Sequence, residues 1–119
     1  MNYKFVPTTY FVKEAKRLSK KYRSLKDDLE ELKKQLQANP MMGDDLGNGV
    51  RKVRMAITSK GGGKSGGARV ITLLIKQSAD DAVMGLLLIY DKSDYSNFKE
   101  NVLKRIIHNF YDSLDNNNQ

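Results

Sequence analysis

Residues 50–75 read VRKVRMAIT, SKGGGKSGGA and RVITLLI, two strand-like runs joined by a glycine-rich connector. In the first run, residues 50–58, apolar and other side chains alternate, as on a strand with one buried face: Val53, Met55 and Ile57 against Lys52, Arg54 and Ala56. The second run, residues 69–75, is β-branched and apolar. The pattern predicts a hairpin with a long loop, in which Arg69 lies near the strand that carries Lys52 and Arg54.

Two amphipathic helices are predicted upstream of this hairpin. With Thr9 as N-cap, apolar residues recur at helical spacing: Phe11, Ala15, Leu18 and Tyr22. With Ser24 as the next N-cap the spacing recurs at Leu25, Leu29, Leu32 and Leu36, and Asn39-Pro40 ends the helix. The two helices form a hairpin whose apolar stripes need a further surface to cover.

The remaining segments complete an α+β architecture. Residues 2–7 predict a short edge strand closed by Pro7, residues 43–49 and 78–82 turns, and residues 83–90 (VMGLLLIY) a central strand buried on both faces. A closing helix begins near Asn97, with Glu100 as capping-box partner, and residues 115–119 form a frayed tail. We expect one domain, residues 1–119: an N-terminal helical hairpin packed on a small antiparallel sheet, with a C-terminal helix.

The positive charge is confined to the centre of the chain. The 119 residues hold 21 Lys and Arg against 14 Asp and Glu, a formal net charge of +7. Residues 46–79 contain no acidic residue, and their cations account for the whole surplus: Arg51, Lys52, Arg54, Lys60, Lys64, Arg69 and Lys76. Such a segment predicts a surface for a polyanion, and the alternative is a solvated basic face.

Several classes of protein are excluded or disfavoured. Without Cys there is no disulfide framework, thiolate nucleophile or cysteine zinc site, and no cluster of metal ligands or cofactor is expected. The chain shows no signal-peptide core or membrane span, which favours a cytoplasmic protein. Residues 63–65 (GKS) resemble the end of a nucleotide-binding P-loop, but position 58 is Thr and a strand follows, so no nucleotide cofactor is predicted. His108 is interpreted as a helix-surface residue, and the Asp27-Asp28 and Glu30-Glu31 pairs as helix solvation.

The cations suit one chemistry, the cleavage of RNA by its own 2′-OH. Lys52, Arg54 and Arg69 converge if the hairpin forms, and Lys92 follows the last strand. Arginines stabilise a phosphorane, and a lysine among other cations can act as base. Lys60 and Lys64 would hold RNA backbone from the glycine loop. The alternatives are a phosphate-binding surface without chemistry and, for the loop, a flexible hairpin tip.

Three motifs resemble one family of proteins. Residues 46–54 (LGNGVRKVR), 63–70 (GKSGGARV) and 20–25 (KKYRSL) are similar to the HigB-like branch of the RelE/ParE superfamily of type II toxin–antitoxin toxins. The resemblance implies a RelE-like fold, an endonuclease that acts on ribosome-bound mRNA, and an antitoxin partner that is often a helix-turn-helix protein. It matches Lys52 and Arg54 to a basic pair, Arg69 to a strand arginine and Lys92 to a catalytic position, with Tyr95 a weaker match.

The resemblance also suggests roles. Arg54 and Arg69 would stabilise the cleaved phosphate, Lys52 would be base or a further stabiliser, and Lys92 acid or a second clamp. The predicted RNA-binding set is Arg51, Lys60, Lys64 and Tyr95. No His stands at these positions, which leaves the general base open. ParE-type relatives that inhibit DNA gyrase, and non-catalytic members that bind only antitoxin or RNA, are the competing hypotheses.

Overall fold

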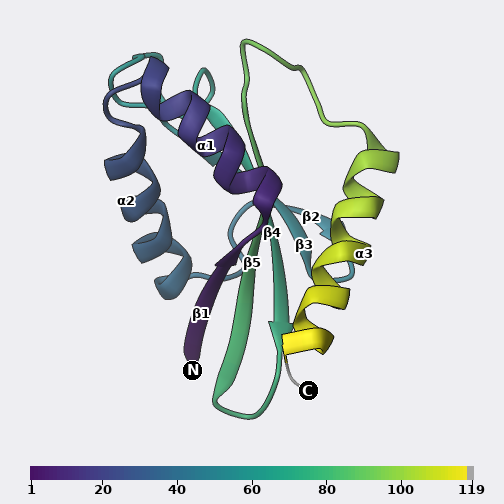
Figure 1. Ribbon diagram of the computed structural model, residues 1–119. Helices are drawn as coiled ribbons and strands as arrows, with labels where there is room; N and C mark the ends of the chain where they lie inside the picture. The colour runs from purple at the N-terminus through teal and green to yellow at the C-terminus, as the bar shows by residue number, and fades with distance from the viewer. Residues whose placement is uncertain (118–119) are drawn as a thin grey trace.

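Three helices and a five-stranded sheet form three layers in the computed structural model, which describes residues 1–117 (Figure 1). The sheet has the order β1-β5-β4-β3-β2, with bounds β1 Asn2–Pro7, β2 Asp44–Gly47, β3 Val50–Met55, β4 Ala68–Lys76 and β5 Asp81–Asp91. One face is covered by α1 (Thr9–Lys21) and α2 (Leu25–Ala38), and the other by α3 (Glu100–Asn117). The predicted α+β class, with a helical hairpin and a C-terminal helix, is confirmed.

The sequence predicts an antiparallel sheet, but the observed sheet is mixed. β1 is an edge strand, as expected, but it pairs with β5 in parallel, from Asn2 opposite Asp81 to Pro7 opposite Leu86. The other three pairings are antiparallel. β5 lies between β1 and β4 and is buried along nearly its whole length, which confirms the predicted central strand.

Two hydrophobic cores fix which side of the sheet each strand residue faces. The core under α1 and α2 joins helix residues to alternate strand residues that include Val53, Met55 and Val70. The core under α3 contains Val50, Ile71 and Leu73 together with the predicted inner residues Leu103, Ile106 and Phe110. Since side chains alternate along a strand, Lys52 and Arg54 share the face of Val50, and Arg69 that of Ile71. These three cations therefore lie on the α3 side.

Two helix starts differ from the sequence prediction. Thr8, not Thr9, is the N-cap of α1: its backbone is extended and its Oγ1 accepts a hydrogen bond from the Phe11 N–H at 3.0 Å. α3 begins at Glu100 and not near Asn97, whose side chain bonds only the neighbouring Phe98 N–H. Ser24 does precede α2, but its hydroxyl makes no capping bond to the helix backbone.

One strand was missed, and the last helix extends into the predicted tail. β2 was predicted as a turn because its four residues, DDLG, are all exposed and have no apolar alternation. It forms a short edge beside β3, interrupted by a bulge. Residues 115–117 of the expected frayed tail belong to α3, and residues 118–119 lie outside the described residues.

α3 is anchored where Phe110 crosses β5 at Gly85. A Cβ at Gly85 would lie 2.8 Å from Phe110 Cζ, so a larger residue requires the Phe110 ring to move. We expect Gly85→Ala to lower the free energy of unfolding by about 1–3 kcal/mol, the usual effect of overpacking. Urea unfolding of Gly85→Ala and of Gly85→Ala/Phe110→Leu measures this, since the smaller Leu should restore part of the loss. Equal stability of Gly85→Ala and the parent chain would contradict the packing.

Candidate functional site

Arg54, Arg69 and Tyr90 form a row across three strands on the α3 side of the sheet. In the strand register Arg54 is opposite Arg69, and Arg69 is opposite Tyr90. Side chains directly opposite one another have Cβ atoms about 4.5–5.5 Å apart. The predicted proximity of Arg69 to the Lys52 and Arg54 strand is thus confirmed.

Lys52 and Lys92 flank this row. Lys52 lies two residues before Arg54 on β3, and its Nζ is 5.9 Å from the centre of the Phe98 ring. Lys92 follows β5, is exposed, and donates its backbone N–H to the Gly67 carbonyl at 3.0 Å. The four predicted cations therefore lie on the α3 face of the sheet and at the end of β5.

Arg54 is the free cation of the row. Its side chain is exposed, and within residues 1–117 it makes no hydrogen bond or ion pair. Like charges directly opposite one another on a sheet destabilise it. An anion bound between Arg54 and Arg69 would relieve this repulsion, so the row is a candidate anion site.

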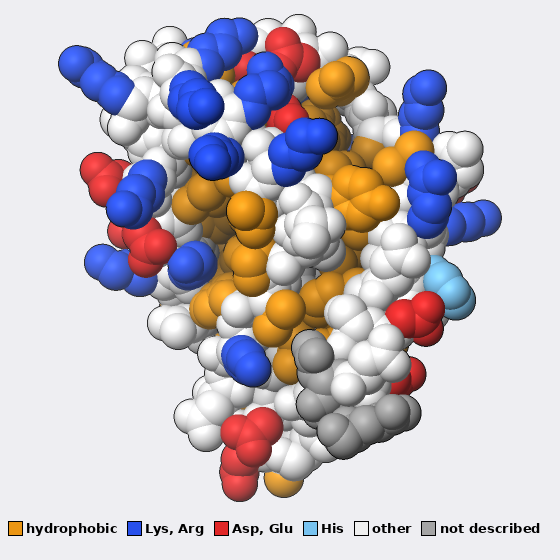
Figure 2. All heavy atoms as spheres, viewed as in Figure 1, with side chains coloured by type: hydrophobic (Ala, Val, Ile, Leu, Met, Phe, Trp, Pro, Cys, Tyr) orange, Lys and Arg blue, Asp and Glu red, His pale blue; other side chains and the backbone are white. Residues whose placement is uncertain are grey.

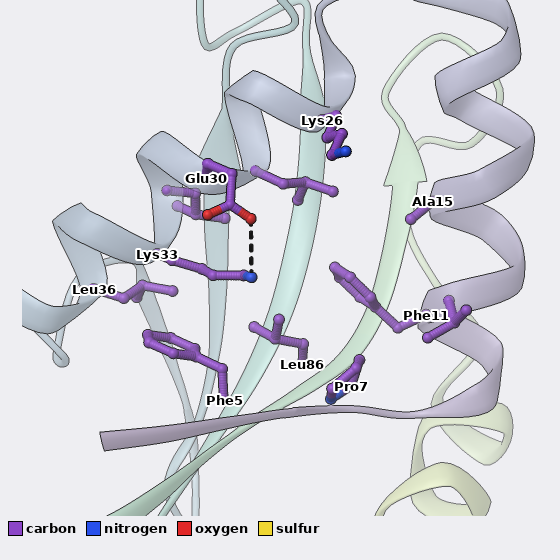
Figure 3. A pocket seen from close by; sticks show the side chains of 12 residues that line it. Phe5, Pro7, Phe11, Ala15, Lys26, Glu30, Lys33, Leu36 and Leu86 are labelled. Carbon is purple, nitrogen blue, oxygen red and sulfur yellow. Dashed lines mark hydrogen bonds and ion pairs between the residues drawn. The ribbon is translucent and has the colours of Figure 1, made fainter. Parts of the chain in front are cut away.

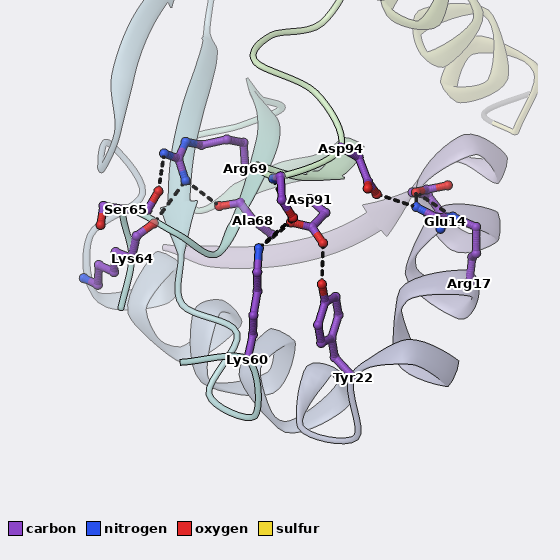
Figure 4. Close-up of polar contacts among 11 residues, drawn as sticks. Glu14, Arg17, Tyr22, Lys60, Lys64, Ser65, Ala68, Arg69, Asp91 and Asp94 are labelled. Atoms are coloured by element: carbon purple, nitrogen blue, oxygen red, sulfur yellow. Dashed lines mark hydrogen bonds and ion pairs between the residues drawn. The ribbon is translucent and has the colours of Figure 1, made fainter. Parts of the chain in front are cut away.

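Arg69 is buried, with 7% of its surface exposed. Its guanidinium donates to three backbone carbonyls of the glycine loop and its end: Lys64 at 3.0 Å, Ser65 at 3.2 Å and Ala68 at 3.2 Å (Figure 4). Nε–H and one Nη2 proton make no bond within the described chain. No carboxylate neutralises this buried charge among residues 1–117, and such a charge favours an incoming anion.

Tyr90 was not predicted as a site residue. It is 4% exposed, and its hydroxyl is the one buried side-chain polar atom without a partner in the described chain. Burial raises the pKa of Tyr90, and the charge of Arg69 opposes that rise. An unsatisfied buried hydroxyl costs free energy, so its place beside Arg69 calls for a functional reason. The sequence signal was weak, because Tyr90 ends an apolar run and resembles a core residue.

An aromatic groove opens next to the row. It has a volume of about 480 Å³, and its lining includes Tyr10, Leu88, Tyr90, Tyr95 and Phe98. Tyr95 is 58% exposed and stands edge-on to Tyr90, with ring centres 6.4 Å apart. Figure 2 shows hydrophobic side chains in the hollow between α1 and α3, with Lys and Arg side chains above it. Aromatic faces beside cations are what a single-stranded nucleic acid requires.

Two predicted RNA-binding residues are already held by other groups. Alternation places Arg51 on the opposite face from Lys52, and its guanidinium donates to the Gly43 carbonyl at 3.0 Å and lies 3.7 Å from Asp45. The ammonium of Lys60 pairs with Asp91 at 2.8 Å. Lys64, in contrast, is exposed, and its ammonium has no partner within residues 1–117.

The glycine loop, residues 56–67, is anchored and is not a free hairpin tip. Its first half is tied to the start of α2: Thr58 Oγ1 donates to Asp28 Oδ1 at 2.6 Å, and the Ser59 N–H donates to Ser24 Oγ at 2.8 Å. At its end a Cβ on Gly67 would collide with the Met55 carbonyl, so the loop base packs directly on β3. Asp28 thus does more than solvate its helix.

Asp91 is a buried hub that sequence reasoning missed. Its carboxylate accepts hydrogen bonds from Lys60 Nζ at 2.8 Å, Tyr22 Oη at 2.7 Å and Ser93 Oγ at 2.7 Å (Figure 4). Burial alone would raise the pKa of Asp91, but the bonds from Lys60, Tyr22 and Ser93 outweigh it and hold that pKa well below its usual range. The sequence signal for this residue was an acidic side chain at the end of an apolar strand.

Other features of the surface offer no comparable chemistry. A hollow of about 240 Å³ between β1, α1 and α2 is lined mainly by apolar side chains, with one Glu30–Lys33 ion pair at 3.1 Å beside it (Figure 3). Residues 1–117 bring no three His, Asp or Glu side chains together as metal ligands. His108 is exposed on the surface of α3, as predicted, and it lies beside Asp112. No helix in the described part of the chain is long and apolar enough to cross a membrane.

Comparison with known families agrees with this geometry. The model of the RelE toxin of RelE/RelB toxin–antitoxin systems matches residues 4–116, nearly the whole chain. The chain belongs to the RelE toxin family. Its role is that of the toxin in a toxin–antitoxin system, and a cognate antitoxin is its partner. The match spans the three strands that carry the cation row, β3, β4 and β5.

Proposed function

We propose that this RelE-family toxin is a ribosome-dependent mRNA endoribonuclease that arrests translation. The observation that carries the proposal is the row of Arg54, Arg69 and Tyr90. Within residues 1–117 its two arginines have no carboxylate partner, and the buried Tyr90 hydroxyl beside them has no hydrogen bond. Arginine suits the phosphorane because its planar guanidinium matches the oxygens of a phosphate. The aromatic groove next to the row supports an RNA substrate, since unstacked bases pack on aromatic rings.

The reaction would be an attack of the 2′-OH on the neighbouring phosphate. The 2′-OH loses its proton as the O2′–P bond forms, and the P–O5′ bond breaks as the 5′-oxygen takes up a proton. Arg54 and Arg69 stabilise the charge on the phosphorane. Lys52 is base or a further stabiliser, and Lys92 is acid or a second clamp, both at the margins of the row.

Primer extension on messages from cells that express the chain tests the proposal. We expect new cuts within translated regions that are absent when Arg54→Ala is expressed at the same level. Arg54 is a better probe than Arg69, because the Arg69 side chain also holds the glycine loop. Growth arrest without cuts in the messages, together with inhibition of the supercoiling activity of DNA gyrase, would contradict the proposal and favour the gyrase-inhibitor alternative.

Tyr90→Phe separates function from stability. The variant removes a buried hydroxyl that has no partner, so we expect the free energy of unfolding to rise by about 1 kcal/mol. We expect RNA cleavage to fall about 10- to 100-fold, because a hydrogen bond to a charged phosphate is worth about 1.5–3 kcal/mol. Thermal melts and cleavage rates on the same preparation measure both. Unchanged cleavage would remove Tyr90 from the site.

A further inference from the structure

We propose that Asp91 and Lys60 are positioning residues that fix the glycine loop against the cation row, so that Lys60 acts through Asp91 and does not contact RNA. The inference rests on the proposed ribonuclease function. It assigns Lys60 a different role from the RNA contact that the sequence predicts. It also gives a role to the carboxylate between Tyr90 and Lys92, which bonds Lys60 and Tyr22.

The first step is the direction of the Lys60 side chain. Its ammonium donates to Asp91 Oδ1 at 2.8 Å and to Ser93 Oγ at 2.9 Å, and it lies 5.9 Å from the centre of the Tyr22 ring. The side chain of Lys60 is 22% exposed and that of Asp91 is 0% exposed. Two of the three ammonium protons are therefore used within residues 1–117, and moving the ammonium to a phosphate would remove the counter-charge of a buried carboxylate, which is strongly unfavourable.

The second step is what the Lys60–Asp91 pair joins. Asp91 ends β5 directly after Tyr90, a member of the cation row. Tyr22, at the end of α1, donates to the other carboxylate oxygen at 2.7 Å, so the carboxylate is fixed from the helix side as well. Lys60 belongs to the glycine loop. The pair therefore fixes the loop relative to the strand that carries Tyr90 (Figure 4).

The third step connects the loop to the reacting groups. The far half of the loop supplies the Lys64 and Ser65 carbonyls that hold the Arg69 guanidinium. The loop base is bonded to the residue after Asp91, through the Lys92 N–H and the Gly67 carbonyl at 3.0 Å. In between, Gly61, Gly62 and Gly63 have φ of +81°, +80° and +63°, and a Cβ added at any of them would meet no side chain of the described residues within 4 Å. Without the Lys60 bond the loop keeps its anchors at Thr58, Ser59 and Gly67 but loses the contact that joins its middle to Asp91.

Lys60 and Lys64 form a matched pair for the test: both stand on one loop, and within residues 1–117 the Lys60 ammonium has a carboxylate partner while the Lys64 ammonium has none. We expect Lys64→Met to raise KM, to leave kcat unchanged and to reduce the salt slope of RNA binding by about one. We expect Lys60→Met to lower kcat about 10- to 100-fold through misplacement of the reacting groups, with KM and the salt slope unchanged. A Lys60→Met variant with the raised KM and reduced slope of Lys64→Met would overturn the proposal.

Amide hydrogen exchange tests the positioning without any activity. We expect residues 59–67 to exchange at least several-fold faster in Lys60→Met than in the parent chain, with Lys64→Met unchanged. Asp91→Asn should accelerate exchange in the same segment. If the parent chain cuts no RNA, the ribonuclease proposal fails, whereas accelerated exchange still supports the Lys60–Asp91 coupling. Identical loop exchange in Lys60→Met and the parent chain would overturn the coupling itself.

Discussion

Arg54→Ala is expected to reduce RNA cleavage about 10²- to 10³-fold, the loss seen when one preorganised donor to a transition-state charge is removed. Arg54 makes no bond to the described chain, so the variant removes no structural contact. Its positive charge lies opposite that of Arg69. We therefore expect Tm to stay the same or rise slightly, because a like-charge pair is relieved.

Arg105→Ala is the matched control for this variant. Arg105 is also an exposed arginine, but it stands on α3 between the buried residues Leu103 and Ile106 and outside the cation row. Cleavage by Arg105→Ala should stay within about twofold of the parent chain, as expected for a surface substitution that removes no contact of the site. Equal cleavage by Arg54→Ala and Arg105→Ala would mean that the row does not act on RNA.

Asp91→Asn is expected to cause the largest loss of stability. The Lys60 ammonium would remain partly buried without a counter-charge, and breaking a buried pair costs about 3 kcal/mol. For a domain of this size we expect Tm to fall by about 10 °C. Asp94→Asn is the control, because its partner Arg17 is exposed and such pairs contribute at most about 1 kcal/mol. Equal losses of Tm in the two variants would contradict the role of Asp91 as a buried hub.

The stability that Asp91 contributes should depend on pH in acid. Its pKa in the folded protein lies below the value of about 3.9 expected in the unfolded chain. A depressed folded-state pKa means that the contribution is complete above the unfolded value and is lost as the pH falls below about 4. The gap in Tm between the parent chain and Asp91→Asn should therefore narrow from neutral pH toward acid. A Tm difference that stays constant down to the lowest pH at which the protein folds would contradict an ionised Asp91 carboxylate in the folded state.

Local pattern was enough to predict that Arg54 and Arg69 lie close together, but not that Tyr90 completes the row. Alternation at residues 50–58 fixed the common face of Lys52 and Arg54, and a hairpin across the glycine connector brings Arg69 opposite that strand. The central position of β5 followed from its continuous apolar run. The parallel pairing of β1 did not follow, because residues 2–7 carry no signal for the partner strand.

The hydrogen-bond partners of the site could not be predicted from local pattern. Tyr22 and Asp91 are 69 positions apart, and Lys60 and Asp91 are 31 apart, so only the tertiary fold brings them together. Sequence spacing also gave no sign that Arg69 is buried. Its partners are backbone carbonyls of the loop, and every residue type carries such a carbonyl. The HigB-like branch and the individual catalytic roles stay predictions.

The most direct test is cleavage of a defined message on purified ribosomes by the purified chain. Attack by the 2′-OH leaves a 2′,3′-cyclic phosphate on the upstream fragment and a 5′-hydroxyl on the downstream one. We predict fragments with these ends for the parent chain and an intact message for Arg54→Ala. The ribonuclease function would be contradicted if the message stays intact when the folded parent chain is added at the concentration that arrests growth in cells.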